Sequence, residues 1–243
     1  MAEVACLSQL YRLCREIQGV YRQGAFFTLV TDGSAYAPIF REPQHFASEY
    51  ALELRQMIAR LGLGQFLRIV DLNDVIRKNA NLFSEALEKA QEEVGGYWNL
   101  NDPYLSRLVE NTMTNINLTM HSEDELRDVF ISHCNPSLEE EIRERAISSA
   151  FEYVVFLEAL NEANILSREF PEALRATCHP KQGQLGLHMV SPKSFNYPWN
   201  GVGVLEEGKA CVRFEDEVRR DSRYTAVHVA GEEYPFYYLR EGG

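Results

Sequence analysis

Apolar residues recur at helical spacing near the start of the chain. Six of them follow the three-to-four residue period of an amphipathic helix: Leu7, Leu10, Tyr11, Cys14, Ile17 and Tyr21. This helix is predicted to end near Gln23-Gly24. Residues 25–30 are then apolar, aromatic and β-branched, which predicts a strand. Asp32-Gly33 follows the strand directly and predicts a tight turn.

The same alternation occurs a second time. A helical pattern runs over residues 46–61 and stops at Gly62, and residues 66–70 read as a short buried strand that ends at Asp71. Helix, strand, helix, strand predicts a parallel or mixed sheet covered by helices, in which ligand groups gather at the carboxyl ends of strands. Asp32 and Asp71 both occupy such ends.

The remaining chain divides into a helical part and a strand-rich part. Residues 73–166 carry helical stripes over 82–94, 105–116 and 138–157. Beyond Pro171 six strands are expected, at residues 174–178, 185–190, 202–205, 210–214, 225–230 and 236–239. Residues 206–209 (EEGK) predict a hairpin turn. The prediction is an α/β fold: a mixed β-sheet with helices packed on it, a helix-rich middle and a strand-rich C-terminal part.

We expect one domain with a helix-rich portion at residues 1–170, a strand-rich portion at residues 171–243, and a polar pocket between the two portions. No internal repeat and no linker long enough to force two independent domains is present.

Charge and cysteine usage narrow the function classes. The chain of 243 residues has a formal net charge of -12, so its field repels polyanions and a nucleic-acid partner is not expected. The basic cluster Arg219, Arg220 and Arg223 is interleaved with acidic residues, which favours a solvated charged face. Five cysteines lack close pairs, and the first 18 residues have neither a basic leader nor a long apolar run. These features predict a cytoplasmic protein without a membrane anchor.

Several longer strings are more specific. Residues 17–25 (IQGVYRQGA) and 31–36 (TDGSAY) resemble the helix, strand and Asp-Gly segment of the isonitrile synthases in the pyoverdine/dityrosine biosynthesis family. Residues 170–180 (FPEALRATCHP) resemble the family's block of Phe-Pro, arginine, strand and His-Pro. Residues 197–202 (YPWNGV) resemble its Pro-Trp-His block, and residues 238–241 (YLRE) resemble its closing segment.

The resemblance implies an activity. Members convert the amino group of an aromatic amino acid, tyrosine or tryptophan, into an isonitrile in natural-product biosynthesis, and a carbon atom of ribulose 5-phosphate is used. It implies an amino acid and a sugar phosphate as small-molecule partners, and no metal or organic cofactor. The oligomeric state is left open, with a homodimer as one option.

That chemistry requires cations for a phosphate and groups that move protons. Arg175 is a candidate fork to phosphate or carboxylate on an apolar strand, with a structural ion pair as the ordinary alternative. Lys181 is a candidate second point charge, although exposed lysines are common. His179 is a candidate proton carrier, with a structural histidine as the alternative. Asp32 is a candidate to orient or deprotonate the amine, or is simply a turn residue.

Two further candidates and one departure complete the predicted site. Trp199 lines the pocket or fills the core, and His188 faces the pocket or the opposite side of its strand. The family's histidine after Pro-Trp is here Asn200, which exchanges hydrogen bonds but no proton at neutral pH.

Two alternatives to an isonitrile synthase therefore remain open. The first is a non-catalytic relative that binds an amino acid or another metabolite on the same scaffold. The second is a metal-dependent oxygenase, in which His121 and Glu123 form part of a facial triad and His179, His188 or His228 supplies the third ligand.

Overall fold

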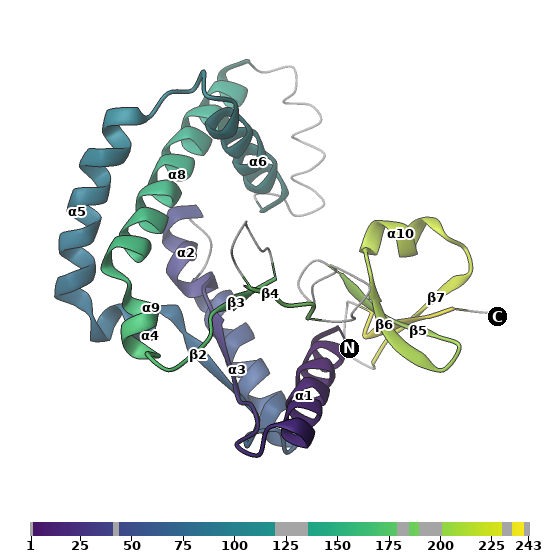
Figure 1. Ribbon diagram of the computed structural model, residues 1–243. Coiled ribbons are helices and arrows are strands. Elements are labelled where there is room, and N and C mark those ends of the chain that lie inside the picture. The colour runs from purple at the N-terminus through teal and green to yellow at the C-terminus, as the bar shows by residue number, and fades with distance from the viewer. Residues whose placement is uncertain are drawn as a thin grey trace. The chain divides into compact units, whose positions relative to one another are not determined.

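A computed structural model describes residues 2–40, 44–119, 136–178, 185–189, 201–229 and 235–240. The chain forms two compact units, and each gathers segments that are distant in sequence (Figure 1). Unit 1 comprises Met1–Leu29, Ala51–Ile69 and Ala173–Gly243, and unit 2 comprises Val30–Tyr50 and Val70–Glu172. The predicted α/β class is confirmed, but the described strands form separate small sheets instead of the single mixed sheet that was expected.

The first core of unit 1 lies along its first helix. Helix α1 (Ala2–Val20) confirms the predicted amphipathic helix, because Leu7, Leu10 and Cys14 on its apolar stripe are almost fully buried. They pack with residues from three later elements: α3 (Gln44–Arg60), β1 (Phe27–Thr31) and β2 (Leu67–Asp71). The ring of Tyr11 meets that of Phe66 edge-on at 5.1 Å between centroids.

Strands β1 and β2 form a two-stranded sheet. The amide of Phe27 donates to the carbonyl of Phe66 at 2.8 Å at one end, and the hydroxyl of Thr31 donates to the carbonyl of Val70 at 3.4 Å at the other. Because the residues at the starts of the two strands bond to each other, and so do the residues at their ends, the strands run parallel. Their carboxyl ends, followed by Asp32 and occupied by Asp71, therefore lie at the same edge of this sheet, as predicted.

A second sheet in unit 1 is built from the C-terminal residues. Its strand order is β6-β5-β8-β7, made by β5 (Val202–Glu206), β6 (Lys209–Arg213), β7 (Tyr224–Val227) and β8 (Tyr237–Arg240). β5 pairs with β8 in parallel and the other pairs are antiparallel, so the sheet is mixed. The predicted hairpin is confirmed: Glu207 and Gly208 both have positive φ, as a tight turn between twisted strands requires.

The two predicted strands nearest the sequence blocks are much shorter than expected. β3 (Ala176–Thr177) and β4 (Leu185–Gly186) pair in parallel over two residues each. Leu174 is 89% exposed, so the apolar start of the predicted strand has no layer to pack against. Leu187 and Met189 pack against the core around α1 and so leave the ladder. Apolar residues that alternate along the chain, such as Leu187 and Met189, can thus be buried in a core without being part of a strand.

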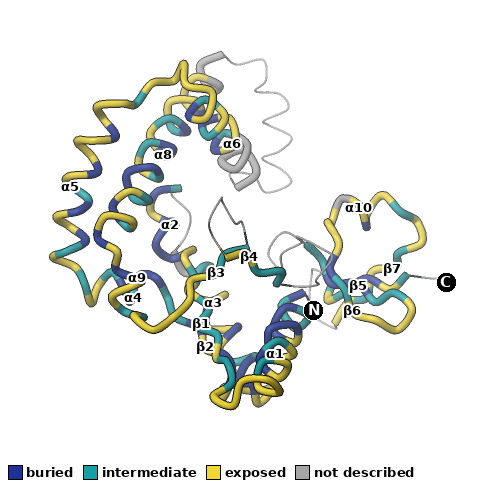
Figure 2. Tube along the Cα trace, viewed as in Figure 1, coloured by how far each residue is buried: buried dark blue, intermediate teal, exposed yellow. Residues whose placement is uncertain are grey.

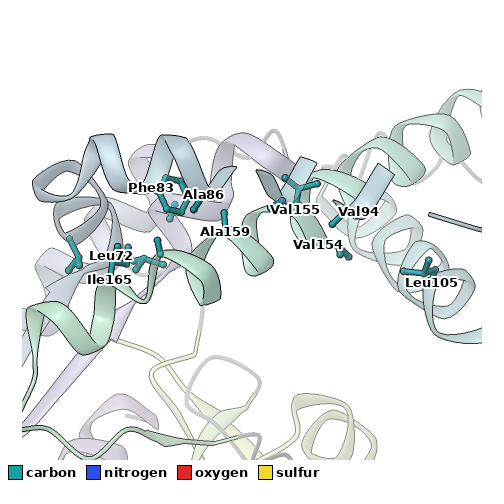
Figure 3. Close-up of a cluster of buried hydrophobic side chains, with 13 residues drawn as sticks. Leu72, Phe83, Ala86, Val94, Leu105, Val154, Val155, Ala159 and Ile165 are labelled. Carbon is teal, nitrogen blue, oxygen red and sulfur yellow. The ribbon is translucent and has the colours of Figure 1, made fainter. Parts of the chain in front are cut away.

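Unit 2 is helical. Its long helices, α5 (Ala80–Tyr97), α6 (Pro103–Thr119) and α8 (Pro136–Ala163), confirm the three predicted helical stripes. Small residues on α5 and α8, such as Ala86, Ala90 and Ala159, let the helices pack closely, and Phe83 and Val94 fill the space between them (Figure 3). Figure 2 shows buried and exposed turns alternating along both helices, as expected for surface helices.

Of the four short helices described, three were not predicted, and the one at Leu72–Lys78 lies in the stretch 73–166 that was expected to be helical but has no apolar stripe of its own. Helix α2 (Gly33–Phe40) begins where a turn was expected, and α4 (Leu72–Lys78) follows β2 directly. Helix α9 (Ile165–Glu169) follows Asn164, which is in the left-handed conformation, and α10 (Glu215–Arg220) packs Val218 against β5 and β8. Each has eight residues or fewer, too few for a clear hydrophobic period. The charged face expected around Arg219 and Arg220 is exposed as predicted.

Charge is divided unequally between the units. Unit 1 contains 15 Lys and Arg residues against 12 Asp and Glu, a net charge of +3, whereas unit 2 contains 9 against 24, a net charge of -15. The formal charge of -12 thus arises from unit 2 alone. Within the part of the chain that the structure describes, no helix has both the length and the apolar character needed to cross a membrane.

Candidate functional site

Asp32 links the end of β1 to the start of α2. Its carbonyl accepts hydrogen bonds from the amides of Ala35, at 2.9 Å, and Tyr36, at 3.1 Å, so it begins the helix and the predicted turn is wrong. A Cβ on Gly33 would lie 3.1 Å from the Cβ of Ala47 in α3. Glycine therefore allows α2 to start close against the neighbouring helix α3.

Asp71 ends β2 and holds the two strand ends together through Ser34. The buried hydroxyl of Ser34 donates to the Asp71 carboxylate, which also accepts the amide of Asn73 at 2.9 Å and so caps α4. The side-chain amide of Asn73 donates to the carbonyl of Ser34 at 3.0 Å. These hydrogen bonds give the Asp71 carboxylate a structural role. Asp32 is the other carboxylate at this edge of the sheet, and it is the candidate for a role in chemistry.

An aromatic cluster lies beside this edge within unit 2. The ring of Tyr36 lies 5.3 Å from Tyr153 and 5.2 Å from Phe156, and Phe40 lies 5.8 Å from Tyr153, all between centroids. At the end of α2, Ser149 donates to the carbonyl of Ile39 at 2.8 Å. These contacts hold α2 against α8.

The electrostatics of Asp32 and Tyr153 are coupled. Desolvation by surrounding atoms raises the pKa of the Asp32 carboxyl, and a backbone hydrogen bond opposes this rise. Asp32 nevertheless keeps exposed surface, so a ligand from solvent can reach it. Burial, followed by the charge of Asp32, raises the pKa of the Tyr153 phenol. A carboxylate with increased basicity beside a neutral phenol can accept a proton and bind an ammonium group.

Tyr153 was missed at the level of sequence. It lies in the helical stripe of α8, where an aromatic residue reads as ordinary core, and no local motif marks it. Tyr153 is distant from Asp32 in sequence, and only the fold brings the two side chains close enough to interact electrostatically.

The Ser34 and Asp71 network predicts a graded loss of stability. Ser34→Ala should lower the free energy of unfolding by about 1 kcal/mol because one hydrogen bond is lost. Asp71→Ala should cost about 2–3 kcal/mol, because it removes a helix cap and leaves the buried Ser34 hydroxyl without its acceptor. Urea denaturation followed by circular dichroism measures both. Asp74→Ala, at an exposed carboxylate of the same helix, is the control, and equal losses at Asp71 and Asp74 would contradict this role.

Arg175 does not lie where the sequence placed it. It precedes β3 and is exposed, so the argument from a guanidinium buried on an apolar strand is wrong. His188 follows β4, is half-buried, and lies between Leu187 and Met189, which pack into the core of unit 1. Arg175 and His188 belong to unit 1, and Asp32 belongs to unit 2.

The other predicted site residues lie outside the described residues. They are His179, Lys181, Trp199 and Asn200, together with His121 and Glu123 of the alternative metal site. His228, the remaining alternative ligand, is exposed after β7. Over the described ranges, no three His, Cys, Asp or Glu side chains gather in an arrangement that could hold a metal ion.

Two arginines in and beside the C-terminal sheet, Arg213 and Arg223, are engaged by carboxylates. Arg213 donates to Glu206 at 2.9 Å and 3.3 Å, and the Tyr224 hydroxyl donates to the same carboxylate. These hydrogen bonds, that of Arg213 foremost, lower the pKa of Glu206. Arg223 is bound by Asp221 at 2.5 Å. The first ion pair connects the neighbouring strands β5 and β6, and the two pairs compensate the charges of Arg213 and Arg223.

Asp32 does not line either of two surface hollows that are formed by described residues. One, of about 210 Å³, lies between α5 and α8, where Lys89 bridges Glu93 and Glu162. The other, of about 360 Å³, lies in unit 1 and is lined by the end of α1, the segment before β1 and the turn before β2. We therefore assign the candidate site from the strand-end geometry and the electrostatics of Asp32 rather than from the hollows.

Curated proteins that are similar to this chain are named isonitrile or isocyanide synthases. An L-tyrosine isonitrile synthase of Xenorhabdus nematophila is 24% identical to this chain, and the match covers 99% of this chain and 71% of the relative. An L-tyrosine isonitrile synthase of Pseudomonas aeruginosa is 26% identical, with 90% and 66% covered. Isocyanide synthase A of Aspergillus fumigatus is 24% identical, with 90% of this chain but 35% of the relative covered.

The fold agrees with a solved relative. The crystal structure of the PvcA protein from Pseudomonas aeruginosa matches with a TM-score of 0.63 and 26% sequence identity, over 99% of this chain and 77% of that one. The family described as Pyoverdine/dityrosine biosynthesis protein matches residues 1–227. The resemblance inferred from the sequence blocks is thereby confirmed, and the chain belongs to the pyoverdine/dityrosine biosynthesis protein family.

Proposed function

We propose that this protein is an isonitrile synthase that acts on the amino group of an aromatic amino acid, with tyrosine as the first substrate to test. The observation that carries the proposal is the Asp32 carboxylate, which is desolvated, reachable from solvent and close enough to the Tyr153 phenol to raise its pKa. The relatives named L-tyrosine isonitrile synthase support the choice of amino acid.

Asp32 has two roles in this proposal. As an anion it binds the ammonium group of the amino acid, and with its raised pKa it accepts the proton that must leave before the nitrogen becomes a nucleophile. The faces of Tyr36 and Tyr153 add cation–π attraction for an ammonium group held beside them. A substrate amine is thereby oriented before it reacts, and orientation lowers the barrier.

The proposed carbon donor is a sugar phosphate such as ribulose 5-phosphate. The free amine adds to the ketone carbon, a proton passes to the departing oxygen, and water leaves to form an imine. Later steps break a carbon–carbon bond and release phosphate. Arg175, Lys181 and His188 are the proposed contacts for the phosphate, with Trp199 beside the substrate. His179 and Asn200 remain proposed catalytic positions. No cofactor is needed for these steps, and the proposed setting is cytoplasmic natural-product biosynthesis.

The direct test is an incubation of the full chain with each aromatic amino acid and ribulose 5-phosphate. Mass spectrometry should detect loss of the amine and formation of the isonitrile, and a colorimetric assay should detect phosphate release. Tyrosine is expected to react, and omission of either substrate should abolish the product. No amine loss and no phosphate release across the panel would refute the activity.

A binding-only relative is the second candidate, because Asn200 replaces the family's histidine. In that case amino acids would raise the melting temperature without turnover, since a ligand that binds only the native state stabilises it.

The role of Arg175 can be separated from folding. Because its side chain is exposed, Arg175→Ala should change the free energy of unfolding by less than about 0.5 kcal/mol. If it holds the phosphate, the same change should raise the KM for ribulose 5-phosphate about tenfold or more, while the KM for the amino acid stays within twofold. Steady-state kinetics with each substrate varied makes the distinction. Arg168→Ala, an exposed arginine of α9, serves as the control.

A further inference from the structure

The end of α1 in unit 1 carries an unusual surface for an acidic protein. It combines arginines with exposed apolar and aromatic residues, which we call the arginine–aromatic surface: Arg15, Val20, Tyr21, Arg22, Phe26, Arg60, Leu61 and Arg68. Val20 is 89% exposed, and Tyr21, Phe26 and Leu61 are also exposed. Figure 2 shows the end of α1 and the segment after it as a continuous exposed stretch.

The charge of this surface is strongly positive. Residues 12–29 and 51–69 contain six arginines, no lysine and two glutamates, a net charge of +4 in a chain of net charge -12. Glu16 is already paired with Arg12 at 3.7 Å. Among the residues that the structure describes, Arg15, Arg22 and Arg60 have no carboxylate partner within ion-pair distance. Such uncompensated cations attract an anionic partner.

The shape and composition favour a protein partner over a flat anionic membrane. The hollow of about 360 Å³ in this surface is lined by Arg15, Phe26 and three glutamines, whose amides can bind carboxylates and peptide groups. Arg68 lies over the Phe26 ring at 5.4 Å from the centroid and is held by Thr28 at 2.9 Å, so ring and guanidinium are ordered together. Exposed aromatic residues with arginine and without lysine are typical of protein interfaces.

A complementary surface exists on the same chain. In α5 of unit 2, Glu85, Glu88 and Glu92 are spaced three and four residues apart, so they share one exposed helix face, which we call the glutamate stripe. Across the described residues, none of the three glutamates forms an ion pair. Lys89, which lies on the same helix, pairs with Glu93 and Glu162 instead. The stripe supplies the carboxylates that the arginines lack.

We propose that the arginine–aromatic surface of one copy binds the glutamate stripe of a second copy of this chain. Each copy carries both surfaces, so two copies of the same chain supply the cations and the carboxylates of this contact. This inference is independent of the proposed reaction, since neither surface contains Asp32, Tyr153 or Arg175.

Sedimentation velocity of the full chain tests the proposal. At 100 mM NaCl the sedimentation coefficient should rise with protein concentration toward that of a dimer, and at 500 mM NaCl it should fall to that of a monomer, because salt screens exposed charges. The variant R15E/R22E should raise the dissociation constant at least tenfold. Lys209→Glu, an equal charge change on exposed β6, should leave it unchanged.

A charge exchange identifies the partner surface. The variant E85R/E88R/E92R should also stay monomeric alone, and an equimolar mixture of it with R15E/R22E should recover a heterodimer, in which the reversed charges face each other. Circular dichroism checks that both variants are folded. A wild-type chain that stays monomeric at every concentration would overturn the proposal, as would undiminished association of R15E/R22E. Binding of a poly-glutamate peptide by a monomeric wild type would likewise overturn it in favour of another acidic protein.

Discussion

Replacement of Asp32 by asparagine is expected to lower the rate of amine conversion by at least about 100-fold, the contribution typical of a positioned acid–base group. Asparagine keeps the shape and is a good residue to begin a helix, so α2 should form as before. It can neither bear the negative charge that binds the ammonium group nor accept its proton. The measurement is kcat by mass spectrometry at saturating substrates, with Asp74→Asn as the control at an exposed carboxylate.

The same substitution should raise thermal stability near neutral pH. Because the pKa of Asp32 is raised by desolvation, the folded chain binds more protons than the unfolded chain between the unfolded and folded pKa values. Stability therefore falls as pH rises through that interval, and this loss is complete above the folded pKa. Asparagine carries no charge, so the variant's advantage in melting temperature should be greatest at neutral pH and should narrow as the pH falls toward 4. A variant that is less stable than wild type at pH 7 and equally active would exclude Asp32 from the site.

Replacement of Leu10 by alanine should produce the largest loss of stability. Leu10 is 0% exposed, in the core that joins α1 to α3, β1 and β2, so truncation leaves a cavity and should cost about 2–5 kcal/mol. Urea denaturation followed by circular dichroism gives the free energy of unfolding. Leu52→Ala, at a leucine of α3 that is 49% exposed, removes the same atoms and should cost less than about 0.5 kcal/mol. Similar losses at both positions would contradict the placement of this core.

Strong periodicity explains what could be predicted. The helices α1, α5 and α8 are long enough for their apolar stripes to be read from spacing, and the hairpin is indicated by Gly208, since glycine adopts positive φ without strain. Alternation of helix and strand also located the shared edge at which Asp32 and Asp71 lie. Each of these features is determined by residues that are close together in the sequence.

The errors come from competition between local and distant interactions. Asp32-Gly33 fits a turn, but Gly33 also permits close contact with Ala47, and that contact favours a helix. The sequence pattern around Arg175 resembles a strand, but Leu174 has no layer to cover it. Tyr153 gains its chemical character from Asp32, which is distant in sequence, so its role in the candidate site had no sequence signal.

The interleaving of the units determines the order in which they can be completed during synthesis on the ribosome. All segments of unit 2 have been translated once Glu172 has been added, whereas unit 1 needs residues from Ala173 onward. The helical unit can therefore close while the nascent chain is still growing. Leu7 and Leu10 of α1, translated among the first residues, must wait for Leu187 and Met189 before their hydrophobic cluster is complete.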